Sequence, residues 1–398
     1  MQTGTRLNSY TTTLILLCIG YFIDFYDLTI FSANYHNIIH DLFHISQAIE
    51  VQQTYLRITN FYTFGIVCGG LLFGILGDKF GRSFVIRYSI IIYSGAIFLS
   101  IFTHSIYLFT FLRYISGFGL ATEFATSSVL ISELFDKRTS KHALSLLYAS
   151  GILGGLAATF IGIFSWKIMF LFGSGAGFIL FILRKKMFES REFLTLPHSL
   201  SKGNVIEIFA NKTNLIKFLA LLAIIIPFNF TISVMFIFPS IIHLDMPLAR
   251  AIPTLLFCFF IGNLLSIAAY SMLRRRFNHP KKILLGNTLA FGIAMAVMGI
   301  INTTLFIPYC LILGFICGGL PCIWIETVAK NYPTHIRNTG TNILYIAGRG
   351  NTMIFNVLMS VWLGTQHLFL VNTAIAAILI TIVSILGILK ANQMSSRT

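Results

Sequence analysis

The stretch Gly74-Ile75-Leu76-Gly77-Asp78-Lys79-Phe80-Gly81-Arg82-Ser83 decides the fold of this chain. It is a charged, glycine-rich turn between two long apolar runs, residues 55–77 and 84–103. Two helices joined this tightly expose their last carbonyl and first amide groups, and an acid followed by bases can satisfy both. A water-soluble core has no need of such a connection. The stretch therefore predicts a very short turn between two membrane-spanning helices.

The composition indicates the same class of protein. Only 10% of the 398 residues are charged, against about 25% in soluble proteins. The 39 Phe residues and a mean hydropathy of +0.83 give more apolar surface than a soluble globule of this length can bury. A spanning helix takes about 20 apolar residues, so a dozen spans use roughly 240 positions and leave short loops. We expect an all-α polytopic membrane protein.

Apolar runs of suitable length recur twelve times along the chain. The expected spans are 12–35, 54–77, 84–103, 106–130, 143–164, 166–183, 215–241, 251–273, 282–301, 304–327, 341–363 and 368–389. No cleavage-like small-residue site follows the first run, so it is expected to be a retained helix and not a signal peptide.

The chain also carries a weak internal repeat, with an offset of about 197 positions. The turn at Gly77 maps onto residues 273–280, and residues 133–138 map onto residues 330–335. Repeats of this kind are typical of secondary transporters. We therefore expect two pseudo-symmetric six-helix halves. Their predicted bounds are 1–183 and 215–398, joined by a basic linker at 184–214.

The distribution of charge predicts the orientation. With twelve spans both termini lie on one side, and most of the 28 Lys and Arg residues fall on that side, whereas the other side has Lys167 and Arg250. The termini are therefore expected to be cytoplasmic, in an inner membrane. The net charge of +15 is explained by this orientation and by contact with anionic lipid headgroups. A nucleic-acid partner is not required.

The opening stretch resembles the signature G-x-x-x-D-[RK]-x-G-R-[RK] in the loop between helices 2 and 3 of major facilitator superfamily transporters. The departure is Ser83, where the family usually has a base. In that superfamily the loop is taken to act as a latch between the halves. The resemblance therefore implies a gating role for five residues, which are Gly74, Gly77, Asp78, Gly81 and Arg82.

Four further stretches and Glu123 resemble known motifs, with residues 113–119 similar to a motif of the whole superfamily and the others similar to motifs of its sugar and metabolite:proton symporter branch. They are residues 24–27, 113–119, 188–193 and 333–340, with Glu123 at the position of that branch's G-G-E. The resemblance implies the twelve-helix major facilitator fold and proton-coupled transport. An Arg-Pro pair that the branch has before the signature aspartate is replaced here by Ile66 and Val67. Any role of that arginine is not carried over.

Asp24 and Asp27 lie near the middle of the first predicted span, where a charge costs about 3 kcal/mol and is normally kept for function. They share a helix face, so each carboxylate opposes ionisation of the other and a proton can be held there. Arg113 is expected to lie against these acids and to be released toward an anionic ligand when an aspartate is protonated. The alternative is a permanent salt bridge that only holds the bundle together.

Glu123 and Arg349 complete the charged candidates for coupling and substrate binding. Glu123 is ten residues beyond Arg113, about 15 Å along one helix, so each needs a partner elsewhere. Arg349 lies between two glycines in the eleventh span, and its guanidinium can hold a carboxylate through two hydrogen bonds. The alternative is that Arg349 extends to the cytoplasmic interface.

Several polar residues give weaker signals. Asn229, Asn351 and Asn356 are neutral candidates for the cavity, or bond to a neighbouring helix. Glu326 is a candidate gate residue near the end of the tenth span. The histidines at 36, 40 and 44 recur every fourth residue, which favours a solvated extension of the first helix over a metal site.

The sequence therefore predicts a transporter and not an enzyme. It has no phosphate-binding loop and no hydrolase motif, so energy is expected to come from an ion gradient, without a cofactor. We expect a monomer in the lipid bilayer that imports a small organic acid or zwitterion together with protons. The alternatives are a proton-driven exporter of the same fold and a sensor that does not transport.

Overall fold

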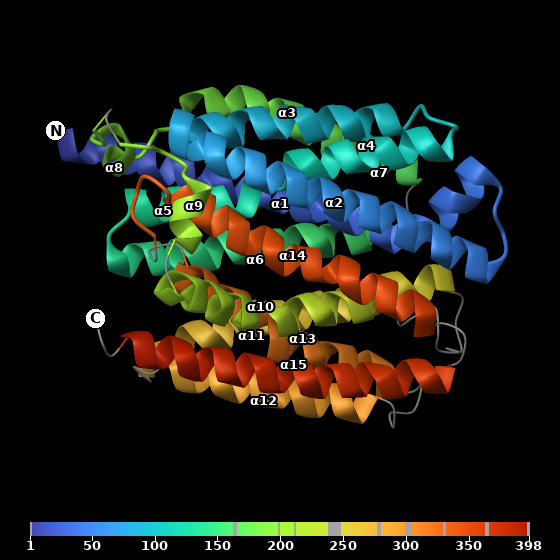
Figure 1. Ribbon diagram of the computed structural model, residues 1–398. Coiled ribbons are helices and arrows are strands. Elements are labelled where there is room, and N and C mark those ends of the chain that lie inside the picture. Colours follow the sequence, from blue (N-terminus) through green and yellow to red (C-terminus); the bar gives the residue numbers. More distant parts are fainter. Residues whose placement is uncertain are drawn as a thin grey trace.

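The computed structural model describes residues 2–161, 165–197, 200–210, 212–237, 248–276, 280–298, 305–328, 332–362 and 366–395. All regular structure within these ranges is helical. The long helices run side by side along one common axis, and α1 begins and α15 ends at the same end of the bundle (Figure 1). We call this end the terminal face and the other end the opposite face.

The helices follow the predicted order of spans. The first half contains α1 (Gln2–Phe43), α2 (Ala48–Phe80), α3 (Arg82–Ser100), α4 (Ile106–Leu120), α5 (Glu123–Leu134), α6 (Lys137–Ile161) and α7 (Trp166–Leu183). Short helices follow, namely η1 (Arg184–Lys186), α8 (Arg191–Leu194) and α9 (Val205–Phe209). The second half contains α10 (Lys212–Ile237), α11 (Leu248–Arg276), α12 (Pro280–Val297), α13 (Phe306–Val328), α14 (Arg337–Trp362) and α15 (Gln366–Ser395).

The predicted fold class is confirmed, with one correction in the fourth span. The span predicted at 106–130 is not one helix, because the chain breaks at Ala121 and Thr122 into α4 and α5. Backbone hydrogen bonds continue across the break, from Ala121 N to Gly117 O at 3.1 Å. Gly119 approaches α3 so closely that a Cβ there would lie 2.7 Å from the backbone nitrogen of Tyr93. The break accompanies this tight packing, and it is a helix kink of identifiable cause.

The turn between α2 and α3 is a single residue, as its glycine-rich sequence predicts. Gly81 has φ 110° and ψ 153°, and its N–H donates to Gly77 O at 3.2 Å. This region of backbone space is essentially restricted to glycine. The shortness of the connection therefore depends on a residue without a side chain.

The two halves meet mainly along two pairs of helices, α2 with α14 and α6 with α11, with smaller contacts of α5 with α14, α6 with α13 and α1 with α11. Figure 1 shows α14 lying across the bundle beside α2. A glycine on α2 permits the close approach, because a Cβ on Gly77 would lie 2.1 Å from the amide nitrogen of Asn338. The contact residues of the signature stretch thus face the second half directly.

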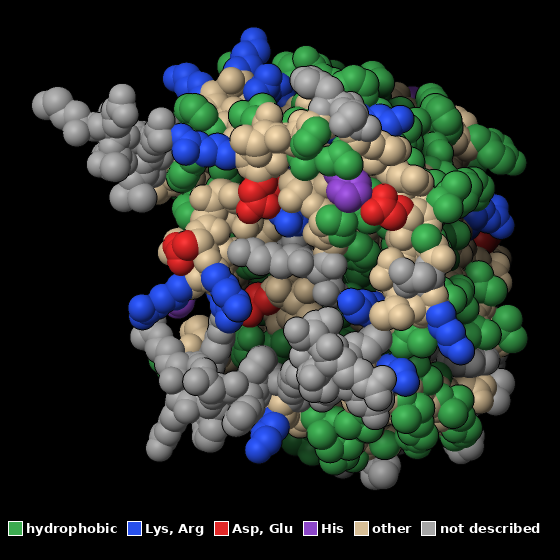
Figure 2. Space-filling model, turned by 60° about the vertical axis from the view of Figure 1, so that its left-hand side comes forward, with side chains coloured by type: hydrophobic (Ala, Val, Ile, Leu, Met, Phe, Trp, Pro, Cys, Tyr) green, Lys and Arg blue, Asp and Glu red, His purple; other side chains and the backbone are tan. Residues whose placement is uncertain are grey.

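The surface of the bundle divides into apolar flanks and a charged end. Large apolar side chains are exposed along the helices, for example Phe61 on α2, Ile179 on α7 and Leu386 on α15. Figure 2 shows Lys and Arg side chains gathered toward the terminal face, with hydrophobic side chains covering the sides. Nine helices in the described ranges are long and apolar enough to cross a membrane. The chain is a multi-pass membrane protein.

Helix α1 continues beyond its predicted end at residue 35 to Phe43, so His36 and His40 lie on its extension and His44 follows directly after it. His40 and His44 are exposed, and Asp41 accepts a hydrogen bond from Trp166 Nε1 at 3.1 Å. Among the residues that the structure describes, no three His, Cys, Asp or Glu side chains are placed to hold a metal ion.

We expect Gly81→Ala to lower the stability of the protein by about 1–3 kcal/mol, because alanine is strained at this φ. The measurement is the melting temperature of the purified protein in detergent. Gly95→Ala on α3 is the matched control, since an added Cβ there meets nothing within 4 Å. Equal melting temperatures for the two variants would contradict the prediction.

Candidate functional site

A small enclosed pocket lies between the two halves, and we call it the central pocket. Its cavity volume is only about 20 Å³, so in this conformation the pocket is nearly filled by its own side chains. Its lining comes from α1, α5 and α6 of the first half and from α10, α13 and α14 of the second. The lining residues are Tyr21, Phe124, Tyr148, Ile225, Phe228, Asn229, Pro321, Trp324, Tyr345 and Arg349. The side chains that line the central pocket are therefore mainly aromatic, and one of them, Arg349, is a cation.

Arg349 supplies that cation and points into the central pocket. Its Nε donates to the hydroxyl of Tyr345 at 3.2 Å, and its guanidinium lies 5.5 Å from the Tyr345 ring centre. The Phe25 ring is 6.0 Å away on another side. Within the described ranges Arg349 forms no ion pair. The side chain is therefore held by aromatic groups, and its charge is not matched by a carboxylate in contact with it.

The aspartates of α1 are both buried, at 6% and 2% exposure for Asp24 and Asp27. Neither Asp27 oxygen has a hydrogen-bond partner among the described residues. Its charged neighbour is Arg113, also 2% exposed, whose guanidinium lies 4.8 Å from both the Phe31 and Tyr62 rings. The expected neighbourhood is present, but a direct salt bridge is not formed.

Asp24 lies on α1 one turn after Tyr21, which lines the central pocket, and one turn before Asp27. Its charged neighbours include Glu123, Arg349 and Asp27. The acids of α1 are one helical turn apart, so Asp24 adjoins both the pocket cation and the more deeply buried Asp27. The structure thus brings Asp24, Asp27, Arg113 and Arg349 into one charged region.

Glu123 is the exception, because it is fully buried in an ion pair with Arg184. Arg184 Nη1 donates to Glu123 Oε2 at 2.9 Å and to Ile86 O at 2.9 Å. Its other terminal nitrogen contacts Glu123 Oε1 and Leu16 O. The sequence predicts Arg184 as the first residue of the linker, and it does follow α7 directly, but its buried ion pair with Glu123 was not predicted. The available signal was its position directly after the apolar run 166–183.

The polar residues that gave weaker signals in the sequence lie in different parts of the structure. Asn229 lines the central pocket, and its amide donates to Ile225 O at 3.2 Å. Asn356 instead donates to Asn60 Oδ1 on α2 at 3.1 Å and so links the halves. The Asn351 amide nitrogen is buried without a partner in the described ranges. Glu326 is half-buried near the end of α13.

A second charged cluster closes the terminal face, and we call it the latch. It consists of Asp78, Arg82, Glu133, Glu192 and Arg337. Arg82 lies 3.1 Å from both Asp78 and Glu133, with all three side chains buried. Arg337 lies 3.0 Å from Glu133 and 2.6 Å from Glu192. Asp78, Arg82 and Glu133 belong to the first half, Glu192 to the segment after α7, and Arg337 to the second half.

The latch residue Asp78 caps a helix of the opposite half. Its Oδ1 accepts from Asn338 N at 3.1 Å, and its Oδ2 accepts from Thr339 N at 2.8 Å and Oγ1 at 2.7 Å. These amides belong to the first turn of α14, whose positive end favours a carboxylate. Arg82 adds a bond to Thr334 O at 2.7 Å. The signature turn therefore holds the halves together at this end.

Sequence reasoning missed several partners of the latch. Glu133, Glu189 and Glu192 were not selected, although the last two lie in the motif 188–193. Glu189 Oε2 accepts from the backbone N–H and the hydroxyl of Ser83, both at 2.9 Å. His335 lies 3.0 Å from Glu207 of α9. The segment after α7 thus binds across the turn and the second half.

A bundle whose halves enclose a charged pocket and are joined at one end by ionic contacts has the organisation of a membrane transport protein. The family model described as Major Facilitator Superfamily matches residues 17–356. The chain belongs to this superfamily, which confirms the resemblance found in the sequence. It is a transporter of small molecules and not an enzyme.

Relatives and solved structures agree with this assignment. The chain is 24% identical over 377 residues to the sialic acid transporter NanX of Escherichia coli K12, covering 92% of this chain and 91% of the relative. It is 22% identical to the 4-hydroxybenzoate transporter PcaK of Acinetobacter baylyi, covering 75% and 73%. The structure of the proton:xylose symporter XylE has the same fold, with a TM-score of 0.78, 14% identity and coverage of 96% and 95%.

We expect Arg184→Met to destabilise the protein by about 3–5 kcal/mol, because it leaves the Glu123 carboxylate buried without its partner. The double variant Glu123→Gln/Arg184→Met removes both charges and is expected to recover most of the loss. Thermal unfolding in detergent measures both, with Lys185→Met at the adjacent exposed base as control. A double variant no more stable than Arg184→Met would refute this account.

We expect Asp78→Asn to open the terminal face, because Arg82 and the first turn of α14 both lose their anionic partner. A cysteine in place of the buried Thr126, which accepts from Asn342 of α14 at 3.1 Å, reports this opening. Its alkylation should become several-fold faster in the Asp78→Asn variant. Glu50→Gln, an exposed acid at the opposite face, is the charge-matched control. Unchanged alkylation would exclude a latch role for Asp78.

Proposed function

We propose that the protein is a secondary active transporter that imports a small organic anion or zwitterion together with protons. The observation that carries this proposal is the Arg349 guanidinium, which lines the central pocket and contacts no carboxylate of the described residues. A ligand carboxylate can accept two hydrogen bonds from such a group. The site therefore suits a ligand that supplies the missing negative charge.

The walls of the pocket narrow the class of ligand. Six of its lining residues are aromatic, namely Tyr21, Phe124, Tyr148, Phe228, Trp324 and Tyr345. Faces and edges of these rings favour a flat or ring-shaped apolar body. In this conformation the cavity is only about 20 Å³, so the halves separate before a ligand enters. The substrates in the names of the relatives NanX and PcaK, sialic acid and 4-hydroxybenzoate, are both carboxylic acids, which supports an acidic ligand here.

Asp24 and Asp27 are proposed to carry the proton. Asp27 is buried beside Arg113 without a direct bond to it. Protonation of Asp27 removes the charge that Arg113 faces, so the electrostatic constraint between α1 and α4 is relaxed. Asp24 lies next to both Asp27 and Arg349, which places it between the proton site and the ligand site. Intramembrane acids in such surroundings are typical of proton relays.

Transport is proposed to follow alternating access between the two halves, residues 1–183 and 215–398, with 184–214 as the connecting linker. The latch holds the terminal face shut, and its opening alternates with closure at the opposite face. The excess of bases on the loops at the terminal face supports a cytoplasmic location for both termini, in an inner membrane. The unit proposed is a monomer driven by the proton gradient.

We expect purified protein in proteoliposomes to accumulate a labelled carboxylate only when the outside is more acidic. The probes are benzoate, nicotinate and N-acetylneuraminate. Arg349→Met should raise KM roughly tenfold to hundredfold, since bonds to a charged group are lost. Asp27→Asn should abolish gradient-driven accumulation and retain exchange of labelled for unlabelled substrate.

Arg57→Met removes an exposed arginine away from the central pocket and is the control for loss of charge. Accumulation only when the inside is acidic would replace import by export. Binding without flux would indicate a sensor. An unchanged KM in Arg349→Met would reject the central pocket as the carboxylate site.

A further inference from the structure

A wide crevice separates α6 and α11 at the terminal face, distinct from the central pocket. Its volume is about 1130 Å³, and all the described residues that line it belong to these two helices, one from each half. At its inner end Tyr148 Oη donates to Asn263 Oδ1 at 3.5 Å. Tyr148 also lines the central pocket, so this contact lies between the two spaces. The crevice is therefore not part of the substrate site described above.

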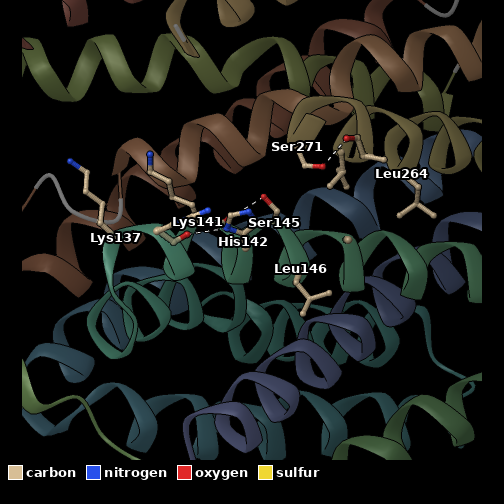
Figure 3. Close-up of a pocket in the computed structure, with 11 residues that line it drawn as sticks. Lys137, Lys141, His142, Ser145, Leu146, Leu264 and Ser271 are labelled. Atoms are coloured by element: carbon tan, nitrogen blue, oxygen red, sulfur yellow. Dashed lines mark hydrogen bonds between the residues drawn. The ribbon is translucent and has the colours of Figure 1, made fainter. Parts of the chain in front are cut away.

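The side chains along the crevice change character in a fixed order. Bases lie nearest the terminal face, at Lys137, Arg138 and Lys141, with His142 beside them. Figure 3 shows the labelled lysines of this group projecting from α6 at one end of the crevice. These positions belong to the first two turns of α6, whose N-terminus adds partial positive charge.

Deeper positions are first hydroxylic and then apolar. Ser145 and Ser271 follow the bases, and Leu146, Ala149 and Leu264 form the wall beyond them. Figure 3 shows the two labelled leucines at the end of the crevice away from Lys137. From the first base to Ala149 the wall extends about 18 Å along α6. The order is charge, hydroxyl and then hydrocarbon surface.

Two of the bases at the mouth have no acid in contact with them among the described residues. Lys137 and Arg138 form no ion pair among the described residues. The nearby carboxylate of Asp136 is engaged by the cap of α6, where it accepts from Arg138 N at 2.9 Å and Thr139 N at 3.3 Å. Hydrogen bonds from Thr139 and Arg138 hold the pKa of Asp136 below its usual range. The mouth is thus open to an external anion.

We propose that the crevice binds an anionic phospholipid from the membrane leaflet at the terminal face. The phosphate lies among the bases at the mouth, the glycerol region meets Ser145 and Ser271, and an acyl chain follows the apolar wall. A soluble anion matches only the outer part, because the inner wall is hydrocarbon and the described lining comes from two helices alone. A phospholipid matches both parts, because its phosphate, glycerol and acyl chain follow one another in the same order as the basic, hydroxylic and apolar side chains of the crevice.

A lipid bound in the crevice also favours one conformation of the transporter over another. The latch holds α2 against α14 at one side of the terminal face, whereas the crevice separates α6 from α11. Because these helices belong to different halves, closing the crevice requires the lipid to leave. A bound anionic lipid therefore stabilises the conformation seen here relative to one in which the ends of α6 and α11 at the terminal face also meet.

The test measures the melting temperature of the full-length protein in detergent with added phosphatidylglycerol or phosphatidylcholine. Phosphatidylglycerol should raise it by several degrees more than phosphatidylcholine does. The variant Lys137→Gln/Arg138→Gln/Lys141→Gln should lose this difference. The variant Lys185→Gln/Lys186→Gln/Lys212→Gln, which removes three exposed bases elsewhere, should retain it.

A second variant tests the hydrocarbon part independently of charge. Ala268→Trp fills the crevice from an exposed position of α11 and should abolish the preference for phosphatidylglycerol with every base still present. Inorganic phosphate and glycerol 3-phosphate should produce no shift. A shift with these soluble anions would overturn the lipid assignment in favour of a solute site. Retention of the lipid preference in both crevice variants would exclude the site.

Discussion

The structure depends on one carboxylate that belongs to one half and caps a helix of the other. Asp78, at the end of α2, accepts hydrogen bonds from the first-turn amides of α14 and is held in place by Arg82. A helix N-terminus needs acceptors for its free amides, and a buried acid needs donors and a counter-charge. Each half therefore satisfies a requirement of the other. The single-residue turn at Gly81 makes this possible, because it brings Asp78 and Arg82 to the same edge of the interface.

The charged groups inside the bundle are of two kinds. Some are paired with an opposite charge of the protein, and others have no ion pair or hydrogen-bond partner of that kind among the residues that the structure describes. Glu123 and Arg184 satisfy each other in a buried pair, which gives them a structural part. Arg349 has aromatic neighbours and a phenol, and Asp27 has no hydrogen-bond donor within the described ranges. Groups that the fold leaves unsatisfied are the ones available to a ligand or a proton. This contrast, and not the number of intramembrane charges, points to Arg349 and Asp27 as the residues of transport.

The terminal face is asymmetric in a way that bears on conformational change. On one side, polar and ionic contacts join α2 to α14, and the segment after α7 adds Glu189 and Glu192 to the same network. On the other side, α6 and α11 are separated by a crevice with basic residues at its mouth. The two interfaces between the halves thus differ. Protein side chains hold α2 against α14, and we propose that a bound lipid keeps the ends of α6 and α11 apart.

Sequence alone determined the helical spans and the short turn, because an apolar run of bilayer length and a glycine-bounded charge cluster are local signals. It also placed Asp24, Asp27 and Arg349 deep in the bundle. It did not find the kink after Leu120 or the buried ion pair of Arg184 with Glu123. Only the tertiary structure decided the partners, since Glu123 and Arg184 are 61 positions apart and Asp78 and Thr339 are 261 apart. Such contacts arise from how helices pack, and packing leaves no pattern in the linear order of residues.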